Sequence, residues 1–145
     1  MKISTKGRYA LQMLLDLAER KDEGFIALKD IAARQGISKK YLEQIVTLLN
    51  SSDMLRTNRG YQGGYMLAKA PEQYTVGHIL RITEGGLSPV ACMEDHPNQC
   101  ERNSFCITLP VWQGLERVMN DYLDNITLQT ILDEYNNAGA DEYYI

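Results

Sequence analysis

The sequence lacks the features of a membrane or secreted protein and those of most enzymes. It holds no run of eighteen apolar residues that could cross a bilayer, and its basic start leads into a segment interrupted by Asp16 and Glu19 rather than into a signal peptide. Histidine is scarce, since only His78 and His96 occur and they lie far apart. No phosphate-binding loop and no nucleophile with a partner set is recognisable. We therefore expect a cytoplasmic protein that is not an enzyme and does not bind a membrane.

Cysteine is scarce too, with three residues that all lie in one short stretch of the second half. An odd number in one stretch argues against the disulfide framework of a small secreted protein, and it favours reduced thiols, a metal site or a redox site. With 145 residues, of which 44% are hydrophobic, the chain can bury the core of one domain or of a compact domain that carries a dimerisation arm.

Charge is distributed unevenly along the chain, although the net charge of −4 would by itself discourage a nucleic-acid interpretation. Residues 1–69 hold 12 Lys and Arg against 7 Asp and Glu, whereas residues 70–145 hold 3 against 12. A basic half suits phosphate, and this asymmetry is typical of a DNA-binding module joined to an acidic sensory or dimerising part.

The first half has the pattern of a helix pair. One amphipathic helix is predicted over residues 5–20 and a shorter one over 28–35, because apolar side chains recur at helical spacing. Gly36-Ile37 then turns the chain sharply. Ser38 is a favourable N-cap for a third helix that continues to about Asn50.

Beyond Asp53 the pattern becomes extended. Two short strands, 54–57 and 65–68, flank a glycine-rich tip where glycine permits positive φ. A helix pair followed by a two-stranded wing predicts a winged helix-turn-helix DNA-binding domain over residues 1–70. The expected fold class is mainly α with a small β-wing, extended by a long C-terminal dimerisation helix.

The segment 71–108 is expected to contain a linking helix and a cysteine-bearing sensor loop. Thr75 can cap the helix, and Gly85-Gly86 ends it. Residues 87–108 lack any sustained period, and an unpatterned stretch of this length points to a site.

Residues 109–135 are expected to form the dimerisation helix, which begins at Pro110, and a short last helix that Thr127 can cap. A flexible acidic tail is predicted over 136–145. The apolar stripe of the dimerisation helix can be buried against the chain's own core or against a second copy. Its members are Val111, Leu115, Val118, Met119 and Tyr122.

The N-terminal part of the third helix is the candidate for reading the major groove. It reads Ser38-Lys39-Lys40-Tyr41-Leu42-Glu43-Gln44. Lys39 and Lys40 can neutralise phosphates or bond guanine, and Gln44 can pair with adenine. Glu43 can only accept hydrogen bonds, for example from the amino group of cytosine. The alternative is an ordinary solvated helix face, because these residue types are common on helix surfaces.

The wing is the candidate for reading the minor groove. Arg56 and Arg59 flank Asn58, and Gly60 lets the backbone come close to DNA. Arginine in a narrow minor groove responds to groove width and negative potential, so the wing would add affinity and a preference for A·T pairs. The alternative is an exposed hairpin whose glycines serve turn geometry alone.

Three segments resemble the Rrf family of bacterial transcription regulators, and the similarity covers nearly the whole chain. They are Met1-Lys2-Ile3-Ser4-Thr5-Lys6-Gly7-Arg8-Tyr9-Ala10-Leu11, Tyr41-Leu42-Glu43-Gln44-Ile45 and Arg59-Gly60-Tyr61-Gln62-Gly63-Gly64-Tyr65. The resemblance implies a homodimer with crossed C-terminal helices that binds a palindromic operator in double-stranded DNA and acts as a repressor. The family's base-contacting positions fall on Ser38, Tyr41, Glu43 and Gln44, with Arg59 in the minor groove.

The cysteines are spaced C-x7-C-x5-C, as Cys92, Cys100 and Cys106, which is too wide for a zinc ribbon. The spacing resembles the cluster loops of IscR-, NsrR- and RirA-like members of the family, which implies an iron–sulfur cluster held by these three residues. Zinc, a redox disulfide and three incidental thiols remain alternatives.

The fourth ligand of such a cluster stays open. IscR-like proteins place a histidine three residues after the last cysteine, where this chain has Leu109, and NsrR-like proteins use an aspartate where this chain has Arg8. His96, Asp95 and Glu94 lie within the loop and could serve, although a lone histidine is usually a surface side chain.

The chain ends in Asp141-Glu142-Tyr143-Tyr144-Ile145, an acidic and aromatic segment. It resembles the tail of CymR-like members of the family, which implies a regulator of cysteine metabolism that binds O-acetylserine sulfhydrylase through Tyr143, Tyr144 and Ile145. The active site of that enzyme accepts peptides that end in isoleucine, and a free carboxylate suits capture by backbone amides. The alternative is a disordered tail.

Overall fold

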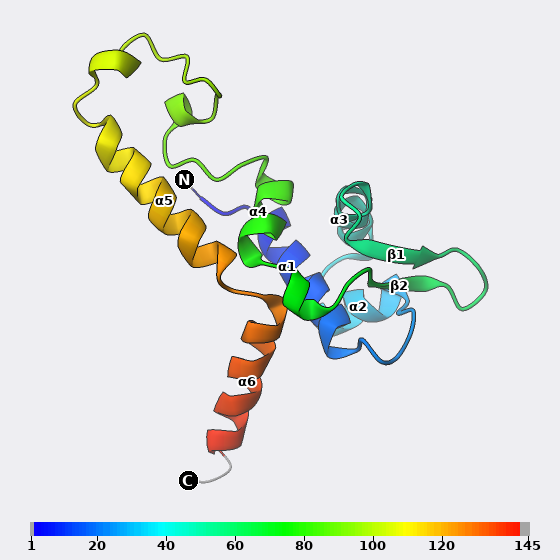
Figure 1. Cartoon of the computed structure of the whole chain (residues 1–145). Coiled ribbons are helices and arrows are strands. Elements are labelled where there is room, and N and C mark those ends of the chain that lie inside the picture. The colour runs from blue at the N-terminus through cyan, green and yellow to red at the C-terminus, as the bar shows by residue number, and fades with distance from the viewer. Residues whose placement is uncertain (1, 143–145) are drawn as a thin grey trace.

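This computed structural model describes residues 2–142. They form six α-helices and one two-stranded antiparallel sheet, joined by loops (Figure 1). The fold class predicted from the sequence is confirmed. Three single-turn 3-10 helices lie at Pro71–Gln73, Ala91–Met93 and Asn103–Phe105. The larger elements are α1 (Thr5–Glu19), α2 (Leu28–Gln35), α3 (Lys39–Ser51), β1 (Leu55–Asn58), β2 (Gly64–Leu67), α4 (Val76–Glu84), α5 (Leu109–Asp124) and α6 (Leu128–Glu142).

Side-chain caps and glycines set the helix boundaries, largely where the sequence predicts them. The hydroxyls of Ser38 and Thr75 accept from the backbone N–H groups of Tyr41 and His78, both at 3.1 Å, and these bonds start α3 and α4. Gly36 (φ 65°) and Gly85 (φ 77°) end α2 and α4 in the left-handed region.

The hydrophobic core is shared between the first half of the chain and the C-terminal elements. It is built around the apolar face of α1, on which Leu14 and Leu17 are buried, and α2, α3 and the wing pack against it. Ile79 of α4 and Leu128 of α6 belong to the same buried cluster. Helix α4 packs against α1 and α3, and α6 packs against α1, so the DNA-binding half shares its core with the C-terminal half.

One buried ion pair fixes α1 against α2. The carboxylate of Asp16 accepts from Arg34 in two hydrogen bonds, of 3.0 and 2.7 Å, and from Gln35 at 2.9 Å, while Arg20 lies 3.6 Å away. Asp16 is only 1% exposed. Burial alone would raise the pKa of Asp16, but the hydrogen bonds from Arg34 and Gln35 and the neighbouring arginine charges lower it below its ordinary value.

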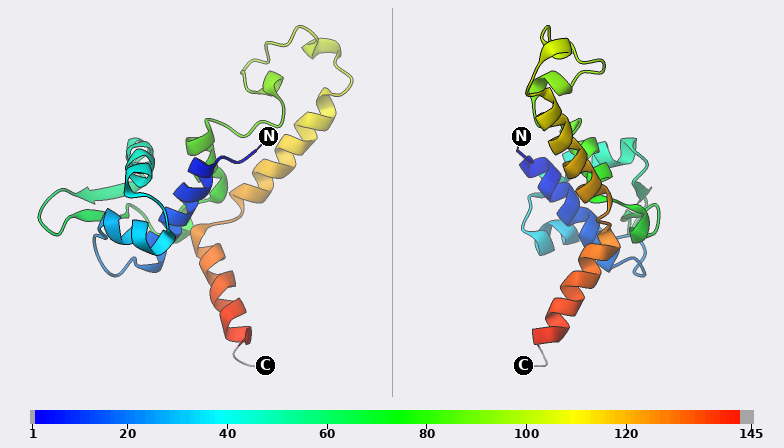
Figure 2. Two further views of the ribbon diagram at one scale, coloured as in Figure 1. Left: turned by 180° about the vertical axis from the view of Figure 1, so that it is seen from behind. Right: turned by 60° about the vertical axis from the view of Figure 1, so that its left-hand side comes forward.

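Helices α5 and α6 diverge from the body (Figures 1 and 2). The C-terminal end of α5 lies against α4, and the N-terminal end carries the loop 87–108 away from the core. No residue of α5 is buried, and its apolar stripe stays open, with Val111 60% and Val118 66% exposed. None of the helices over residues 2–142 has the length and apolar character needed to cross a membrane.

The last helix is longer than predicted, because α6 continues past Tyr135 to Glu142. The predicted boundary, after which residues 136–145 would form a flexible tail, is wrong for residues 136–142. No proline interrupts this stretch, and Asn or Gly lowers helix stability by at most about 1 kcal/mol each. Because Leu128 and Leu132 anchor the first turns in the core, the helix can propagate outward. Tyr143, Tyr144 and Ile145 lie outside the described residues.

Candidate nucleic-acid interface

Helix α3 is anchored by one face and presents the other to solvent. Leu42, Ile45 and Leu49 are fully buried on the inner face. The outer face begins at the capping residue Ser38 and carries the exposed residues Lys39, Lys40, Glu43 and Gln44. The end of α3 that is predicted to contact DNA bases is therefore exposed to solvent.

Tyr41 differs from the other predicted contacts because it is half-buried. Its ring packs edge-on against that of Tyr9, with centroids 5.6 Å apart and an interplanar angle of 83°. This contact orients α3 on α1, so Tyr41 has a structural role whether or not its hydroxyl also reaches DNA.

The wing is a tight hairpin whose root joins the body. The ladder pairs Leu55 with Leu67 and ends at Asn58 opposite Gly64. Ile26, in the segment before α2, extends the sheet through two hydrogen bonds of 2.8 Å with Tyr65. The wing is thereby held beside the start of α2.

The glycines of the wing act through close packing rather than through positive φ. Gln62 is the residue of the tip with positive φ (62°). A side chain at Gly63 would collide with the carbonyl oxygen of Asn58, and one at Gly64 would collide with that of Ile26. Gly60 differs, since a Cβ there would meet nothing closer than 3.5 Å.

A single groove of about 700 Å³ separates α3 from the wing. Lys39 and Glu43 line it from α3, and Arg59 and Gly60 line it from the wing. Its lining includes Leu28 and Lys29 at the start of α2, where the helix has no side-chain cap. Amide donors at a helix N-terminus favour phosphate.

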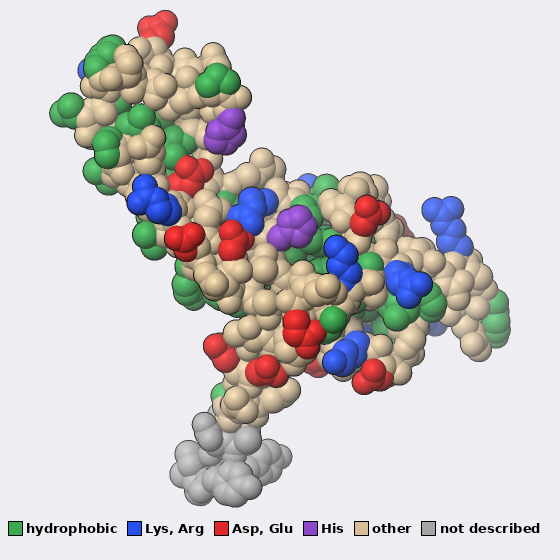
Figure 3. Space-filling model, viewed as in Figure 1, with side chains coloured by type: hydrophobic (Ala, Val, Ile, Leu, Met, Phe, Trp, Pro, Cys, Tyr) green, Lys and Arg blue, Asp and Glu red, His purple; other side chains and the backbone are tan. Residues whose placement is uncertain are grey.

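The groove does not gather every predicted contact. Lys40 and Gln44 are exposed on α3, and Arg56 is exposed on β1 opposite Met66, but none of the three lines the groove. Figure 3 shows basic side chains on and beside the wing and acidic ones along α6. The charge asymmetry of the sequence thus has a spatial counterpart.

Tyr61 is a candidate contact that the sequence reasoning missed. Its side chain is 97% exposed at the tip of the wing, between Gly60 and Gln62. A large aromatic residue inside a glycine-rich tip was the available signal, because a side chain there cannot reach the core of its own domain.

The three cysteines lie in the loop between α4 and α5. All are free and half-exposed. The hydroxyl of Thr108 lies 3.3 Å from Sγ of Cys106, and this hydrogen bond lowers the pKa of that thiol. Soft thiol donors suit an iron–sulfur cluster, but over residues 2–142 no three side chains of His, Cys, Asp or Glu converge as a metal site. The donor chemistry fits a cluster, whereas the present loop arrangement does not gather the donors.

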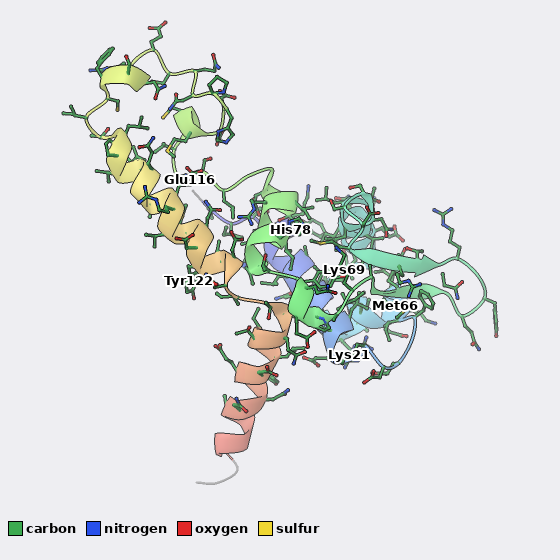
Figure 4. All side chains as sticks on the ribbon, in the orientation of Figure 1. Lys21, Met66, Lys69, His78, Glu116 and Tyr122 are labelled. Atoms are coloured by element: carbon green, nitrogen blue, oxygen red, sulfur yellow. The ribbon has the colours of Figure 1, made fainter. Side chains whose placement is uncertain are left out.

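The candidate fourth ligands belong to the same loop, between Cys92 and Cys100. His96 and Glu94 line a cleft of about 540 Å³ between the C-terminal end of α4 and the middle of α5, together with Glu116, which Figure 4 labels. Asp95 and His96 also line a smaller hollow beside Gln113. Glu94 and His96 share the larger cleft, but over residues 2–142 these side chains do not converge with the cysteines as a metal site.

A helix-turn-helix and a wing that share one groove define the winged-helix class of DNA-binding proteins. The family model of Rrf2, described as an iron-dependent transcriptional regulator, matches residues 3–134. The chain therefore belongs to the Rrf2 family of transcriptional regulators, as its sequence motifs predicted. It is a DNA-binding regulator and not an enzyme.

The relatives cover almost the whole chain. CymR of Bacillus subtilis is 37% identical over 144 residues, which make up 99% of this chain and 97% of CymR. IscR of Erwinia tasmaniensis is 35% identical over 132 residues, or 91% of this chain and 79% of that protein. The solved structure of T. potens IscR matches with a TM-score of 0.77 at 38% identity and covers 95% of this chain and 90% of its own. That of B. subtilis CymR, described as the global cysteine regulator, matches with a TM-score of 0.76 at 36% identity over 92% and 98%.

Proposed function

We propose that the chain is a homodimeric repressor that binds a palindromic operator in the cytoplasm. The observation that carries this proposal is the groove between α3 and the wing, which brings Lys39 and Arg59 to its opposite sides. A DNA strand lying there would have the major groove on the side of α3 and the minor groove on the side of the wing. Bound over a promoter, such a dimer blocks transcription by occupancy.

The exposed stripe of α5 supports the dimer. Val111, Leu115, Val118 and Tyr122 are between 42% and 67% exposed and follow one face of the helix. An uncovered apolar face of this length is unfavourable in water, and a second α5 can cover it. Between the two burial modes left open by the sequence, the exposure of this stripe favours the second copy.

Operator selection tests this function. Random duplexes selected with the protein should converge on an inverted repeat whose half-site centres lie about 34 Å apart, one helical turn. Footprinting should protect major-groove positions in each half-site and minor-groove positions beside them. Selection that fails to enrich any sequence, or that enriches a lone half-site, contradicts the proposal.

For the signal, we infer an iron–sulfur cluster held by Cys92, Cys100 and Cys106. The support is the thiol donor set in one loop and the similarity to IscR proteins. When bound, the cluster would tie three points of the loop together. Because the loop leads directly into α5, a ligand that favours one loop arrangement shifts the population of dimer arrangements by its differential affinity.

Anaerobic purification followed by absorption spectroscopy and by iron and sulfide analysis tests the cluster. We expect a coloured protein that loses its iron in Cys92→Ser, while the exposed Ser104→Ala variant in the same loop keeps it. A colourless, iron-free protein would contradict cluster binding and would favour zinc or a redox disulfide, which zinc analysis and thiol titration distinguish.

The similarity to CymR over 99% of the chain supports a second candidate, control by O-acetylserine sulfhydrylase. Helix α6 leads away from the body as far as Glu142, the residue that precedes the candidate partner-binding segment in the sequence (Figure 2). Deletion of Tyr143 to Ile145 should abolish co-purification with the sulfhydrylase and leave operator binding intact. Equal recovery of the enzyme with and without these residues would discard this candidate.

A further inference from the structure

The buried side chain of Tyr74 closes the root of the wing. Its hydroxyl accepts from the backbone N–H groups of Ala68, at 3.0 Å, and Lys69, at 3.2 Å, and it donates to the carbonyl oxygen of Met54 at 2.7 Å. Met54 precedes β1 and Ala68 follows β2, so one phenol binds both ends of the hairpin. Tyr74 is 2% exposed, and burial raises the pKa of its phenol above the ordinary 10.0, which keeps the proton available for donation at neutral pH.

The backbone of the same residue is bonded to the junction of α5 and α6. The carbonyl oxygen of Tyr74 accepts from the N–H of Leu128 at 3.0 Å, and the N–H of Val76 donates to the carbonyl oxygen of Ile126 at 2.9 Å. Together they form an isolated antiparallel bridge centred on Thr75 and Thr127. Figure 4 labels Lys69, whose N–H is one of the donors to the Tyr74 hydroxyl.

The end of α5 is itself clamped to α4. Arg81 donates to the side-chain oxygen of Asn120 at 2.8 Å and forms an ion pair with Asp124. Gly77 lets the two helices approach, because a side chain there would collide with the carboxylate of Asp124. A continuous set of contacts therefore runs from α5 through the bridge to Tyr74 and the wing.

We propose that Tyr74 is a positioning residue for DNA binding, which holds the wing in its reading pose and transmits the position of the α5–α6 junction to it. The proposal rests on the proposed function, since it assigns a role to the wing in binding the operator. The hydroxyl of Tyr74 bonds three backbone groups at the wing root, of which the N–H of Ala68 and the carbonyl oxygen of Met54 are also bonded to each other at 3.2 Å. A rigid hydrogen-bonded network of this kind can couple the positions of two elements.

A double-mutant cycle with Arg59 tests the positioning role. Arg59→Ala should weaken binding to the selected operator about fivefold or more, and Tyr74→Phe should give a similar loss although it touches no DNA. The double variant should lie within about twofold of Tyr74→Phe alone, because a displaced wing no longer uses Arg59. Tyr135→Phe, the same change on exposed α6, should bind as wild type. Fully additive losses would overturn the proposal.

Hydrogen exchange on the protein without DNA tests the two links separately. Tyr74→Phe should speed exchange most at Lys69, less at Ala68, whose N–H also donates to the carbonyl oxygen of Met54, and not at the amides of α1. A uniform increase over all elements would overturn the positioning role. Val76→Pro removes the donor to Ile126, and proline suits the first position of a helix after the extended residue Thr75. Because the side chain of Val76 is buried beside Leu80, Val76→Ala, which keeps the N–H, is the control for lost packing. The proline variant should also raise exchange at the wing root, and unchanged exchange there would overturn the transmission. If the wild type fails to bind operator DNA, the proposed function fails, while these exchange results still decide the role of Tyr74.

Discussion

Replacement of Asp16 by asparagine probes the contact that holds the helix-turn-helix against α1. The carboxylate is 1% exposed and takes three hydrogen bonds from Arg34 and Gln35. Asparagine keeps the volume but loses the charge, and its amide nitrogen would face donors instead of accepting from them. The substitution therefore leaves Arg34 without its partner at the α1–α2 contact.

The expected loss of stability depends on how well water can hydrate the charge of Arg34 once its partner is gone. Breaking a fully buried ion pair costs about 3–5 kcal/mol. The side chain of Arg34 is 33% exposed, so part of its charge can be hydrated again, and we expect a loss of about 3 kcal/mol in the free energy of unfolding. The exposed Asp22→Asn variant makes the same chemical change near the same helices and should lie within about 0.5 kcal/mol of wild type.

Urea denaturation at fixed protein concentration measures both values, since unfolding of a dimer depends on concentration. The pH dependence has a definite sign. Because the pKa of Asp16 is lower in the folded protein than its ordinary value of 3.8, its contribution is fully present above pH 3.8 and is lost as the pH falls through the folded-state pKa. The difference between wild type and Asp16→Asn should narrow below pH 3.8. A difference that is under 1 kcal/mol at pH 7, or that grows in acid, would refute this reasoning.

Two other predictions concern the wing and the dimer. Gly63→Ala should weaken operator binding with little change in the melting temperature, because its new methyl group collides with the backbone of the tip and not with the core. In Gly60→Ala the new methyl group has room within the chain, so this variant should weaken binding only if DNA approaches that backbone. Leu115→Asp places a charge in the exposed stripe of α5 and should convert the proposed dimer to a monomer in light scattering, whereas Gln113→Asp on another face of α5 should not. A dimeric Leu115→Asp protein, or a Gly63→Ala protein of wild-type affinity, would contradict these interpretations.

The parts of the fold that could be predicted from the sequence have local causes. Ser38 and Thr75 start helices by hydrogen bonds to amides three residues on, and Gly36 and Gly85 end helices by positive φ, so the signals lie within a few residues. The open stripe of α5 was also visible, because a period of apolar residues needs no knowledge of distant partners.

What the sequence could not give depends on contacts between distant segments. In the sequence, Tyr74 is an ordinary residue near a proline. Its role depends on contacts that only the folded chain makes, with Met54 at the wing root and with Leu128 at the α5–α6 junction. The length of α6 was underestimated for a similar reason. The predicted end of the last helix was Tyr135, whereas anchoring of the first turns by the core lets the helix continue.

The candidate site likewise combines features with local sequence signals and features that depend on contacts between distant segments. The positions of Lys39 and Arg59 on one groove require the relative placement of α3 and the wing, which is determined by the packing of both on α1 and by the contacts of α3 with β1. The sequence predicted the residue types on each element. It did not separate Arg56, Lys40 and Gln44, which lie off the groove, from those that line it.

The salt dependence of binding to the selected operator tests the central claim most directly. If Lys39 contacts phosphate in both protomers, the logarithm of the association constant should fall linearly with the logarithm of the salt concentration, and Lys39→Ala should make that slope shallower by about 1.8. Lys21→Ala, which removes an exposed lysine that does not line the groove, should leave the slope unchanged (Figure 4). A wild-type affinity that does not depend on salt, or equal slopes for wild type and Lys39→Ala, would contradict the assignment of this groove to DNA.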